Sequence, residues 1–335
     1  MRTGVAAGIA VLAVLAAVGI GLAGGRVFAP SPTPHRVTVT FTPAPTPSPT
    51  PYDEAALFRE PISGGCATQT SVWVITNGAG LLRYAYAEGK WAVADDTLRS
   101  LTRVRCTDDT VYAVGLVGAV VIANEQTRQI RARDITTEDL FGVSPSQVGA
   151  YIVGSHGAAF LFDPGSGGYQ GGQIFDEDLL DVVAFNPDSA WAVGGHGITY
   201  RLDTRGWSPV GSGQGSTLRA VAGTTAANVI AVGDAGAIVT FTAGGWLTAK
   251  SGVDATLRDV IVAPGVWIAG DNGTLLTTSG VPATPFRKVD IGTTCDLVAL
   301  FTRSNDIWVV GRSAAGGGVW RLRGDGTVQQ HFGGC

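Results

Sequence analysis

A repeat of almost constant length runs through the chain from residue 62 to the C-terminus. Its apolar anchors follow one another at steps of 39 residues, with a last step of 40, and they are Ile62, Leu101, Leu140, Leu179, Leu218, Leu257 and Leu297. A Trp, Tyr or Ile stands ten to twelve residues after each anchor. A period near 40, built from short apolar runs and glycine turns, is typical of radial repeat folds. This repeat restricts the possible folds more than any single motif does.

One copy, residues 218–256, shows how each unit is built. It contains four short runs rich in Val, Ile, Thr and aromatic residues, separated by Gly, Asp and Asn, and no stretch with helical periodicity. Four strands in about 40 residues match one propeller blade, and a closed ring leaves no exposed ends. A solenoid of this period would need a helix in each repeat or polar caps. The sequence therefore predicts an all-β, seven-bladed β-propeller with four-stranded blades.

The most faithful part of the repeat is Val-Gly-x-x-Gly, where glycine supplies the positive φ of a tight hairpin. The string Ser189-Ala-Trp-Ala-Val-Gly-Gly-His-Gly197, with Leu218-Arg-Ala-Val and Gly244-Gly-Trp246, resembles the repeats of bacterial secreted propellers. Those repeats are similar to the propellers of photosystem II assembly factors and, more distantly, to sialidase-type (BNR) repeats. The resemblance implies a propeller fold and no particular activity, because the Asp-box aspartate is missing at two of the turns.

The N-terminal segment predicts an association with a membrane. Residues 3–25 carry no charge, and as a helix they would span about 30 Å of hydrocarbon. We expect residues 1–26 to be a retained single-pass signal anchor, which places the propeller outside the cytoplasmic membrane. A cleaved signal peptide and a secreted protein are the alternative, because small residues suited to cleavage stand at the end of the segment.

A linker at residues 27–56 separates this segment from the propeller domain at 57–335. Eight prolines alternate mainly with Ser and Thr between Pro30 and Pro51, a composition that favours extended, disordered polyproline II conformations. The linker is therefore predicted to be a stalk that holds the propeller away from the membrane. Residues 52–61 regain apolar side chains, and we expect them to pair as an outer strand of the last blade.

Four cysteines agree with an exported protein. Cys66 and Cys106 follow the first two anchors by four and five residues, so they lie near the ends of adjacent innermost strands. Such neighbours can approach within the ~6 Å Cα separation that a disulfide needs. Cys295 and Cys335 stand at almost the same phase one repeat apart. We therefore predict Cys66 paired with Cys106 and Cys295 paired with Cys335, against the alternative of free buried thiols.

The sequence contains few signals for catalysis, a metal site or a cofactor. His156 and His196 occupy the same turn position in neighbouring repeats, which separates them too far for one metal ion with ligands near ~2 Å. The chain has no Gly-x-Ser-x-Gly elbow and no Cys-x-x-Cys pair. A net charge of −4 without a basic run argues against a nucleic-acid partner. We expect a non-enzymatic protein without cofactor, metal or nucleic acid.

Acidic residues recur just before the anchors and in the Gly-x-x-Gly turns, two places that meet on one face of a propeller. They are Asp95, Asp96, Glu138, Asp139, Asp176, Glu177, Asp178, Asp234, Asp254, Asp271, Asp290 and Asp296. Their combined field would attract cations or a basic partner surface. The competing interpretation is that they only solvate exposed turns. An arginine cluster in the second copy either neutralises this face or marks another contact, and it comprises Arg99, Arg103, Arg105, Arg128, Arg131 and Arg133.

Two classes of function remain. The preferred hypothesis is a membrane-tethered scaffold that binds a protein partner at the cell surface or membrane through its acidic face. The alternative is a glycan-binding or glycan-processing propeller, which would use exposed aromatics and one or two carboxylates. The aromatics recur at repeat positions and are therefore expected in the core, which favours the first hypothesis. A cation or a glycan stays open as a further ligand.

Overall fold

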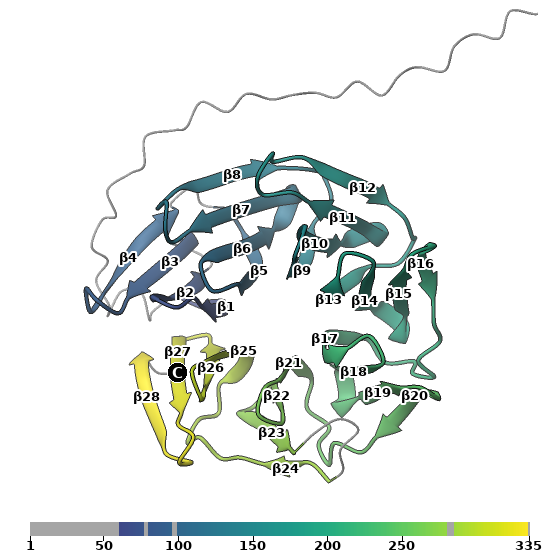
Figure 1. Cartoon of the computed structure of the whole chain (residues 1–335). Helices are drawn as coiled ribbons and strands as arrows, with labels where there is room; N and C mark the ends of the chain where they lie inside the picture. The colour runs from purple at the N-terminus through teal and green to yellow at the C-terminus, as the bar shows by residue number, and fades with distance from the viewer. Residues whose placement is uncertain (1–59, 77–79, 96–98, 280–284, 334–335) are drawn as a thin grey trace, which may run out of the picture. The chain divides into compact units, whose positions relative to one another are not determined.

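The computed structural model describes residues 60–76, 80–95, 99–279 and 285–333. They form seven antiparallel sheets of four strands each, and Figure 1 shows these sheets as blades arranged around a central axis. In every blade the four strands are consecutive in the chain, and the first strand lies innermost. The predicted seven-bladed propeller with four-stranded blades is confirmed.

The first four blades contain β1 to β16. Blade 1 comprises β1 (Ile62–Ala67), β2 (Ser71–Thr76), β3 (Gly80–Ala85) and β4 (Lys90–Asp95); blade 2 comprises β5 (Leu101–Cys106), β6 (Thr110–Gly115), β7 (Ala119–Asn124) and β8 (Ile130–Asp134). Blade 3 comprises β9 (Leu140–Ser146), β10 (Gly149–Gly154), β11 (Ala158–Phe162) and β12 (Tyr169–Gln173); blade 4 comprises β13 (Leu179–Asn186), β14 (Ser189–Gly194), β15 (Thr199–Asp203) and β16 (Gly206–Pro209).

The last three blades repeat the same order. Blade 5 comprises β17 (Leu218–Thr225), β18 (Asn228–Gly233), β19 (Ile238–Thr242) and β20 (Gly245–Ala249); blade 6 comprises β21 (Leu257–Val262), β22 (Val266–Gly270), β23 (Thr274–Thr278) and β24 (Arg287–Lys288). Blade 7 comprises β25 (Asp296–Arg303), β26 (Asp306–Ser313), β27 (Gly316–Leu322) and β28 (Val328–Gly333).

The ring closes by packing between the first and last blades. Ile62 and Val72 of blade 1 share a buried cluster with Phe301 and Trp308 of blade 7, and β1 lies beside β25. The fourth strand of blade 7 is β28, so the C-terminal segment takes the position that we expected residues 52–61 to occupy. Of that segment, residues 52–59 lie outside the described residues.

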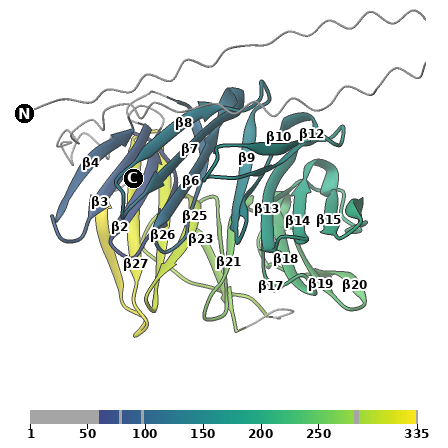
Figure 2. The ribbon, with the colours of Figure 1, turned by 45° about the horizontal axis from the view of Figure 1, so that its top comes forward.

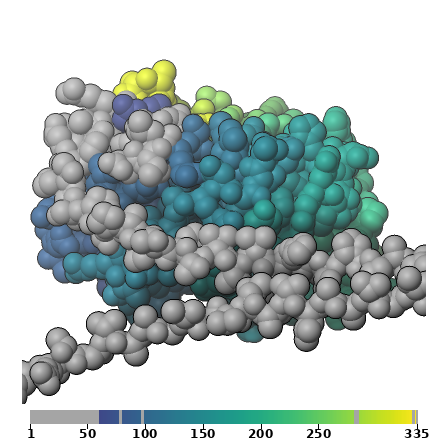
Figure 3. All heavy atoms as spheres, turned by 90° about the horizontal axis from the view of Figure 1, so that it is seen from above, coloured from purple at the N-terminus to yellow at the C-terminus, as the bar shows by residue number. Residues whose placement is uncertain are grey.

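The two ends of the propeller carry different connections, because consecutive strands of each blade alternate in direction (Figure 2). One end, called the loop face below, carries the starts of the innermost strands and the Gly-x-x-Gly turns. The other, called the hairpin end, carries the turns that join first to second and third to fourth strands. Figure 3 shows the molecule from the side of β8 and β12, with atoms of blades 2 and 3 on the near side.

The Gly-x-x-Gly turns have the geometry expected from their glycines. Four of them are short 3-10 turns, η1 (Leu116–Gly118), η2 (Ser155–Gly157), η3 (Gly195–Gly197) and η4 (Asp234–Gly236). Gly118 has φ 71°, and a Cβ there would lie 2.0 Å from the carbonyl oxygen of Thr136. Positive φ and this close approach both demand glycine, which confirms the interpretation of this motif as a turn.

A disulfide joins the innermost strands of blades 1 and 2. Cys66 in β1 and Cys106 in β5 are bonded, with a Cα–Cα separation of 5.6 Å, as predicted from their repeat positions. Cys295 is buried just before β25. Its predicted partner, Cys335, lies outside the described residues, so the second disulfide stays a prediction.

The segments before the propeller lie outside the described residues. This holds for the predicted anchor at 1–26 and for the predicted stalk at 27–56, and both stay predictions. In the part of the chain that is described, no helix has the length and apolar character needed to cross a membrane.

Candidate functional site

The centre of the loop face is a cavity built by one repeat position. In every blade the pairing of the innermost strand with its neighbour is irregular directly after the anchor, and such bulges redirect a side chain. The bulged residues all line one cavity of about 380 Å³, and they are Ser63, Thr102, Phe141, Leu180, Arg219, Arg258 and Val298. The seven repeats thus present seven different side chains to one space at the ring axis, called the channel mouth below.

The two sides of the channel mouth differ in chemistry. Phe141 and Leu180 of blades 3 and 4 are apolar, whereas Arg219 and Arg258 of blades 5 and 6 are cationic. Arg312, which also lines the mouth, stands directly after Gly311, the place that an acidic turn residue has in blades 5 and 6. An apolar arc therefore faces an arginine arc across the mouth.

The positive charges of the three arginines at the mouth are neutralised to different degrees. Arg219 donates to Asp234 and Arg258 donates to Asp271, each with an Nη2–Oδ2 distance of 3.0 Å. These bidentate pairs neutralise two carboxylates that we predicted for the acidic face. Arg312 makes no ion pair in the described part of the chain. Burial, reinforced by the charge of Arg258, lowers the pKa of the Arg312 guanidinium.

Below the mouth, a buried ion cluster connects three blades. Arg105 of β5 donates to Asp259 of β21 at 2.9 Å, and it lies 3.9 Å from Asp181 of β13. Arg103, also in β5, lies 3.7 Å from Asp181 and 3.6 Å from Asp259. Both carboxylates are buried, so their pairing with arginine offsets the desolvation of the four charges. The cluster ties blade 2 to blades 4 and 6.

The two aspartates also bind the blade that follows each of them. Asp181 accepts the backbone N–H of Val221 at 3.1 Å, and Asp259 accepts that of Leu300 at 2.8 Å. Burial raises the pKa of the Asp181 carboxyl, although Arg103 and Arg105 oppose this shift. The arginines and the neighbouring backbone groups therefore hold these carboxylates in the interior of the ring.

This cluster was not among the predicted sites, although the repeat contains a signal for it. The second residue after each anchor is charged in three blades and small in four, and in chain order these residues are Gly64, Arg103, Gly142, Asp181, Ala220, Asp259 and Ala299. Opposite charges among small residues at one repeat position indicate a pairing across the axis.

Three of the predicted acidic residues hold turns of the preceding blade. Asp139, Asp178 and Asp296 each precede an anchor. Their side chains accept the backbone N–H groups of Val117, His156 and Asn272 at 2.9, 2.9 and 3.2 Å. Val117, His156 and Asn272, whose N–H groups donate these hydrogen bonds, all have positive φ. These carboxylates thus stabilise blade junctions besides contributing charge.

The remaining acidic candidates are distributed unevenly over the loop face. Asp176, Asp254 and Asp290 are exposed, as is Glu177, which accepts a bond from Tyr200 at 3.3 Å. Asp95 is buried at the end of β4, because that strand turns it into the blade, so it adds little to the surface charge. Asp96 lies outside the described residues.

Glu138 completes a small polar group on blade 3. It accepts a hydrogen bond from Ser155 at 2.9 Å and contacts Nδ1 of His156 at 2.7 Å. The hydrogen bond with His156, and then that with Ser155, lower the pKa of the Glu138 carboxyl. In return, the hydrogen bond and charge of Glu138 raise the pKa of the His156 imidazole. Glu138, Asp139, Asp176, Glu177 and Asp178, here called the acidic arc, form the most acidic part of the described loop face.

The predicted arginine cluster of the second repeat does not form one site. Arg103 and Arg105 enter the channel, whereas Arg99 pairs with Asp134 on the outside of the blade. Arg131 and Arg133 donate to carbonyl groups of the following blade. Arg128 reaches a separate pocket between blades 1 and 2. The interpretation that these arginines neutralise the acidic face is therefore wrong, because the strands direct them to different surfaces.

The fold is similar to those of several propellers of known structure. The chain resembles the crystal structure of the WD40 propeller domain of Doa1 with a TM-score of 0.67 and 12% identity, covering 78% of this chain and 92% of that one. It resembles YCF48 from Cyanidioschyzon merolae with a TM-score of 0.61 and 12% identity, covering 80% and 97%. A YCF48 structure bound to a D1 peptide matches with a TM-score of 0.56 and 15% identity, covering 69% and 81%.

These likenesses concern the fold alone. No protein-family model matches the chain, and no curated protein matches it either. The predicted resemblance to the propellers of photosystem II assembly factors is supported in three dimensions through YCF48. Within the described residues, no group of three or more His, Cys, Asp or Glu side chains is arranged to hold a metal ion.

Proposed function

We propose that this protein is a non-enzymatic propeller, tethered to the outer side of the cytoplasmic membrane, that binds another protein through its loop face. The observation that carries this proposal is the asymmetry of that face. The acidic arc lies on blades 3 and 4, whereas the arginine arc borders the channel mouth on blades 5 to 7. A partner surface with the opposite arrangement of charges would bind in one orientation only.

The channel mouth adds a contact for a protruding segment. Phe141 and Leu180 offer apolar area, and Arg312 offers a guanidinium without an ion-pair partner in the described part of the chain. An acidic segment with an apolar side chain complements both. That YCF48 has been solved with a bound D1 peptide supports the idea that a propeller of this shape binds a polypeptide.

The burial of three tryptophans at repeat positions argues against the glycan hypothesis. Trp73, Trp191 and Trp308 are buried between the blades, and Phe141 is the aromatic residue among those lining the mouth. Glycan sites present exposed aromatic faces for stacking, together with carboxylates for acid–base work. We therefore place the function with protein binding.

Site-directed photo-crosslinking in native membranes tests the proposal. A photo-reactive amino acid replaces Phe141 at the mouth in the full-length protein, and the control carries it at the exposed Val328 of β28. We expect one reproducible protein adduct from the first position and none of that mass from the second. The same adduct from both positions, or retention on carbohydrate without a protein adduct, would contradict the proposal.

Two charge variants locate the contact. Arg312→Glu reverses the charge of one arginine in the arginine arc. Asp176→Asn with Glu177→Gln removes two negative charges from the acidic arc and leaves the carboxylates that bind turn N–H groups unchanged. Each is expected to reduce the adduct, and more strongly at low salt, where surface charges are least screened. Arg323→Glu in the hairpin between β27 and β28 is the matched control, and an equal loss there would exclude a specific loop-face contact.

A further inference from the structure

Two of the blade junctions contain the same kind of aromatic contact. An aromatic residue in the second strand of one blade packs on a cross-strand pair in the third and fourth strands of the next. At the junction of blades 4 and 5, the ring of Trp191 lies 4.5 Å from Phe241 and 5.2 Å from Trp246, measured between centroids. At the junction of blades 3 and 4, Tyr151 lies 6.3 Å from Trp207. Aromatic rings thus fill the outer space between these blades.

The junction of blades 1 and 2 departs from this pattern. Trp73 holds the position of Trp191, but the cross-strand pair that faces it is Ala123 with Ile130. The same register positions in blade 5 hold Phe241 and Trp246. Two large rings are therefore replaced by a methyl group and a branched aliphatic side chain. A space remains where blade 5 has aromatic groups.

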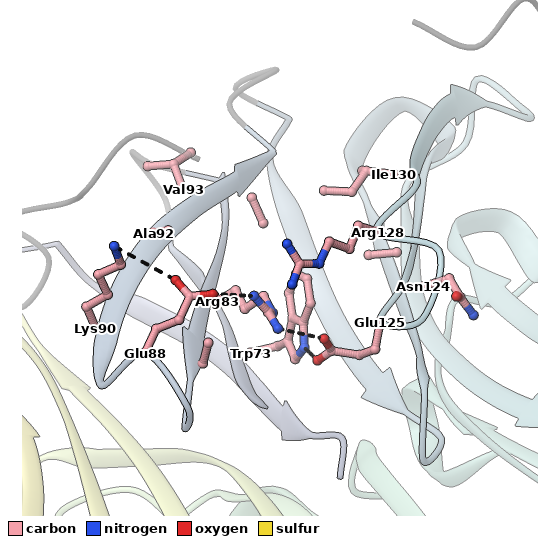
Figure 4. A pocket seen from close by; sticks show the side chains of 13 residues that line it. Trp73, Arg83, Glu88, Lys90, Ala92, Val93, Asn124, Glu125, Arg128 and Ile130 are labelled. Atoms are coloured by element: carbon pink, nitrogen blue, oxygen red, sulfur yellow. Dashed lines mark hydrogen bonds and ion pairs between the residues drawn. The ribbon is translucent and has the colours of Figure 1, made fainter. Parts of the chain in front are cut away.

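This space is a pocket of about 120 Å³. Ala85, Ala92 and Ala94 of blade 1 form one wall, Ala123 and Ile130 of blade 2 form the other, and Figure 4 shows Trp73 between them. A cavity of about 150 Å³ lined by apolar side chains binds benzene. The pocket therefore has the size and lining that suit a single six-membered aromatic ring.

The polar group at the base of the pocket is fully used by the protein. Glu125 accepts hydrogen bonds from Trp73 Nε1 at 2.9 Å, from Arg83 at 2.9 Å and from Thr68 at 2.6 Å. Burial alone would raise the pKa of the Glu125 carboxyl, but these hydrogen bonds and the charge of Arg83 lower it. Glu125 fixes the indole in place, and three of its hydrogen bonds go to protein groups.

The rim of the pocket offers donors. Arg128, exposed at the turn after β7, adopts a φ of 54°, and Figure 4 shows its side chain extending from blade 2 toward Trp73. The Nζ atom of Lys90 lies 3.9 Å from Oε2 of Glu88. Counting Glu88 and Glu125 against Arg83, Lys90 and Arg128, the pocket has a net charge of +1.

We propose that this pocket, called the aromatic pocket, binds the side chain of a tyrosine or phenylalanine that is flanked by acidic residues in a protein partner. The ring would take the place that Phe241 and Trp246 occupy in blade 5, and it would pack against Trp73 at a tilted or edge-on angle, as those rings do against Trp191. The flanking carboxylate would contact the exposed guanidinium of Arg128. The site lies near the hairpin end, so it is separate from the loop-face contact proposed above.

Calorimetric titration of the full-length protein in detergent tests the proposal with defined peptides. The probe is acetyl-Asp-Tyr-Asp-amide, and the comparisons are acetyl-Asp-Ala-Asp-amide, acetyl-Lys-Tyr-Lys-amide and free 4-hydroxyphenylacetate. We expect the probe to bind at least about tenfold more tightly than either comparison peptide, since the ring and the flanking charge both contribute. Equal affinity for the alanine or the lysine peptide would overturn the proposal. Tighter binding of 4-hydroxyphenylacetate than of the probe would instead indicate a small-molecule site.

Three variants make the result specific to the aromatic pocket. Ala123→Phe places the ring of blade 5 into the pocket and is expected to weaken probe binding about tenfold or more. Arg128→Glu, an exposed change that the fold tolerates, is expected to weaken it about fivefold. Arg323→Glu, in the corresponding hairpin of blade 7, is the matched control and should leave binding unchanged. Binding that survives both pocket variants would overturn the proposal.

One further variant separates a partner from the chain itself. The chain carries Tyr52-Asp53-Glu54, which has the same chemistry as the probe. The proposal predicts that the probe binds the unaltered protein and that Tyr52→Ala leaves its affinity unchanged. Binding that is seen only in the Tyr52→Ala variant would overturn the assignment to a partner. Because loop-face variants such as Arg312→Glu leave this pocket intact, failure here and failure of the proposed function are distinguishable.

Discussion

The junction between blades 4 and 5 and the junction between blades 1 and 2 use the same repeat positions in different ways. In the first, Trp191 packs on Phe241 and Trp246, and its indole N–H donates to the carbonyl of Ala226 at 3.0 Å. In the second, Trp73 faces small residues and donates to the side chain of Glu125. Nonpolar contact fills one junction, whereas the other keeps a pocket held open by a buried carboxylate.

The hollow junction has a covalent link that the filled junction lacks in the described residues. The disulfide between Cys66 and Cys106 connects the innermost strands of blades 1 and 2, and Cys66 pairs in register with Trp73. A blade can therefore lose packing area on its outer side where its inner side is fastened. The difference teaches that a binding space can arise within a repeat fold at one junction without loosening the ring.

The largest expected effect comes from removing that link. Replacing Cys66 and Cys106 by serine opens a crosslink that spans 40 residues, and chain-entropy arguments predict a loss of about 4 kcal/mol in the free energy of unfolding. Urea unfolding of the oxidised wild type and the variant measures it. An unchanged unfolding midpoint would show that the hollow junction does not depend on the disulfide.

Hollowing the filled junction should come next in size. Phe241→Ala removes a ring that contacts both Trp191 and Trp246, and we expect a loss of about 3 kcal/mol, at the lower end for such changes because Phe241 is only partly buried. The exposed Leu247→Ala in the neighbouring strand is the control, with an expected change below about 0.5 kcal/mol. Similar losses for both variants would refute the importance of aromatic filling.

Glu125 should make the hollow junction sensitive to acid. Its pKa in the folded protein is lowered from the ordinary value of 4.5, so its contribution is complete above that pH and is lost as the pH falls through the lowered value. Hydrogen bonds to a charged group suggest that Glu125→Gln costs about 1.5 kcal/mol near neutral pH.

Urea midpoints of wild type and Glu125→Gln, compared at about pH 7 and about pH 3, measure this difference. The two proteins should differ most at the higher pH, and the difference should be smaller at the lower pH. A gap that stays constant across both conditions would mean that the carboxylate charge is not what stabilises the junction.

The smallest effect on stability is expected from filling the pocket. Ala123→Phe introduces the side chain found at the same position in blade 5, and because the space is already open we expect the free energy of unfolding to change by less than about 1 kcal/mol. Thermal and urea unfolding check this. A loss of several kcal/mol would show that blades 1 and 2 have no room for a ring.

Much of the propeller could be predicted from the repeat itself. The steps between anchors predicted the blades, the glycines predicted the turns, and equal repeat phase predicted the bond between Cys66 and Cys106. The same phase argument placed the acidic candidates at blade connections, because a position relative to an anchor determines the end of the ring at which a residue lies.

The pairing of those residues could not be predicted in the same way. Asp234 is neutralised by Arg219, and Asp95 points into its blade, yet both look like surface acids in the sequence. Arg105 and Asp259 are separated by 154 residues, and nothing in the local sequence indicates that they meet. Their contact depends on the closure of the ring.

The sequence by itself determined the period, the strands, the turns and the order of the blades, because these depend on local alternation of side chains and on glycine conformations. The tertiary structure alone decided which charges meet across the axis, which carboxylates are buried and which junction stays open. Those features arise where blades from distant parts of the chain come together. The effect of a side chain's size and charge at these places depends on which residues surround it once the ring has closed.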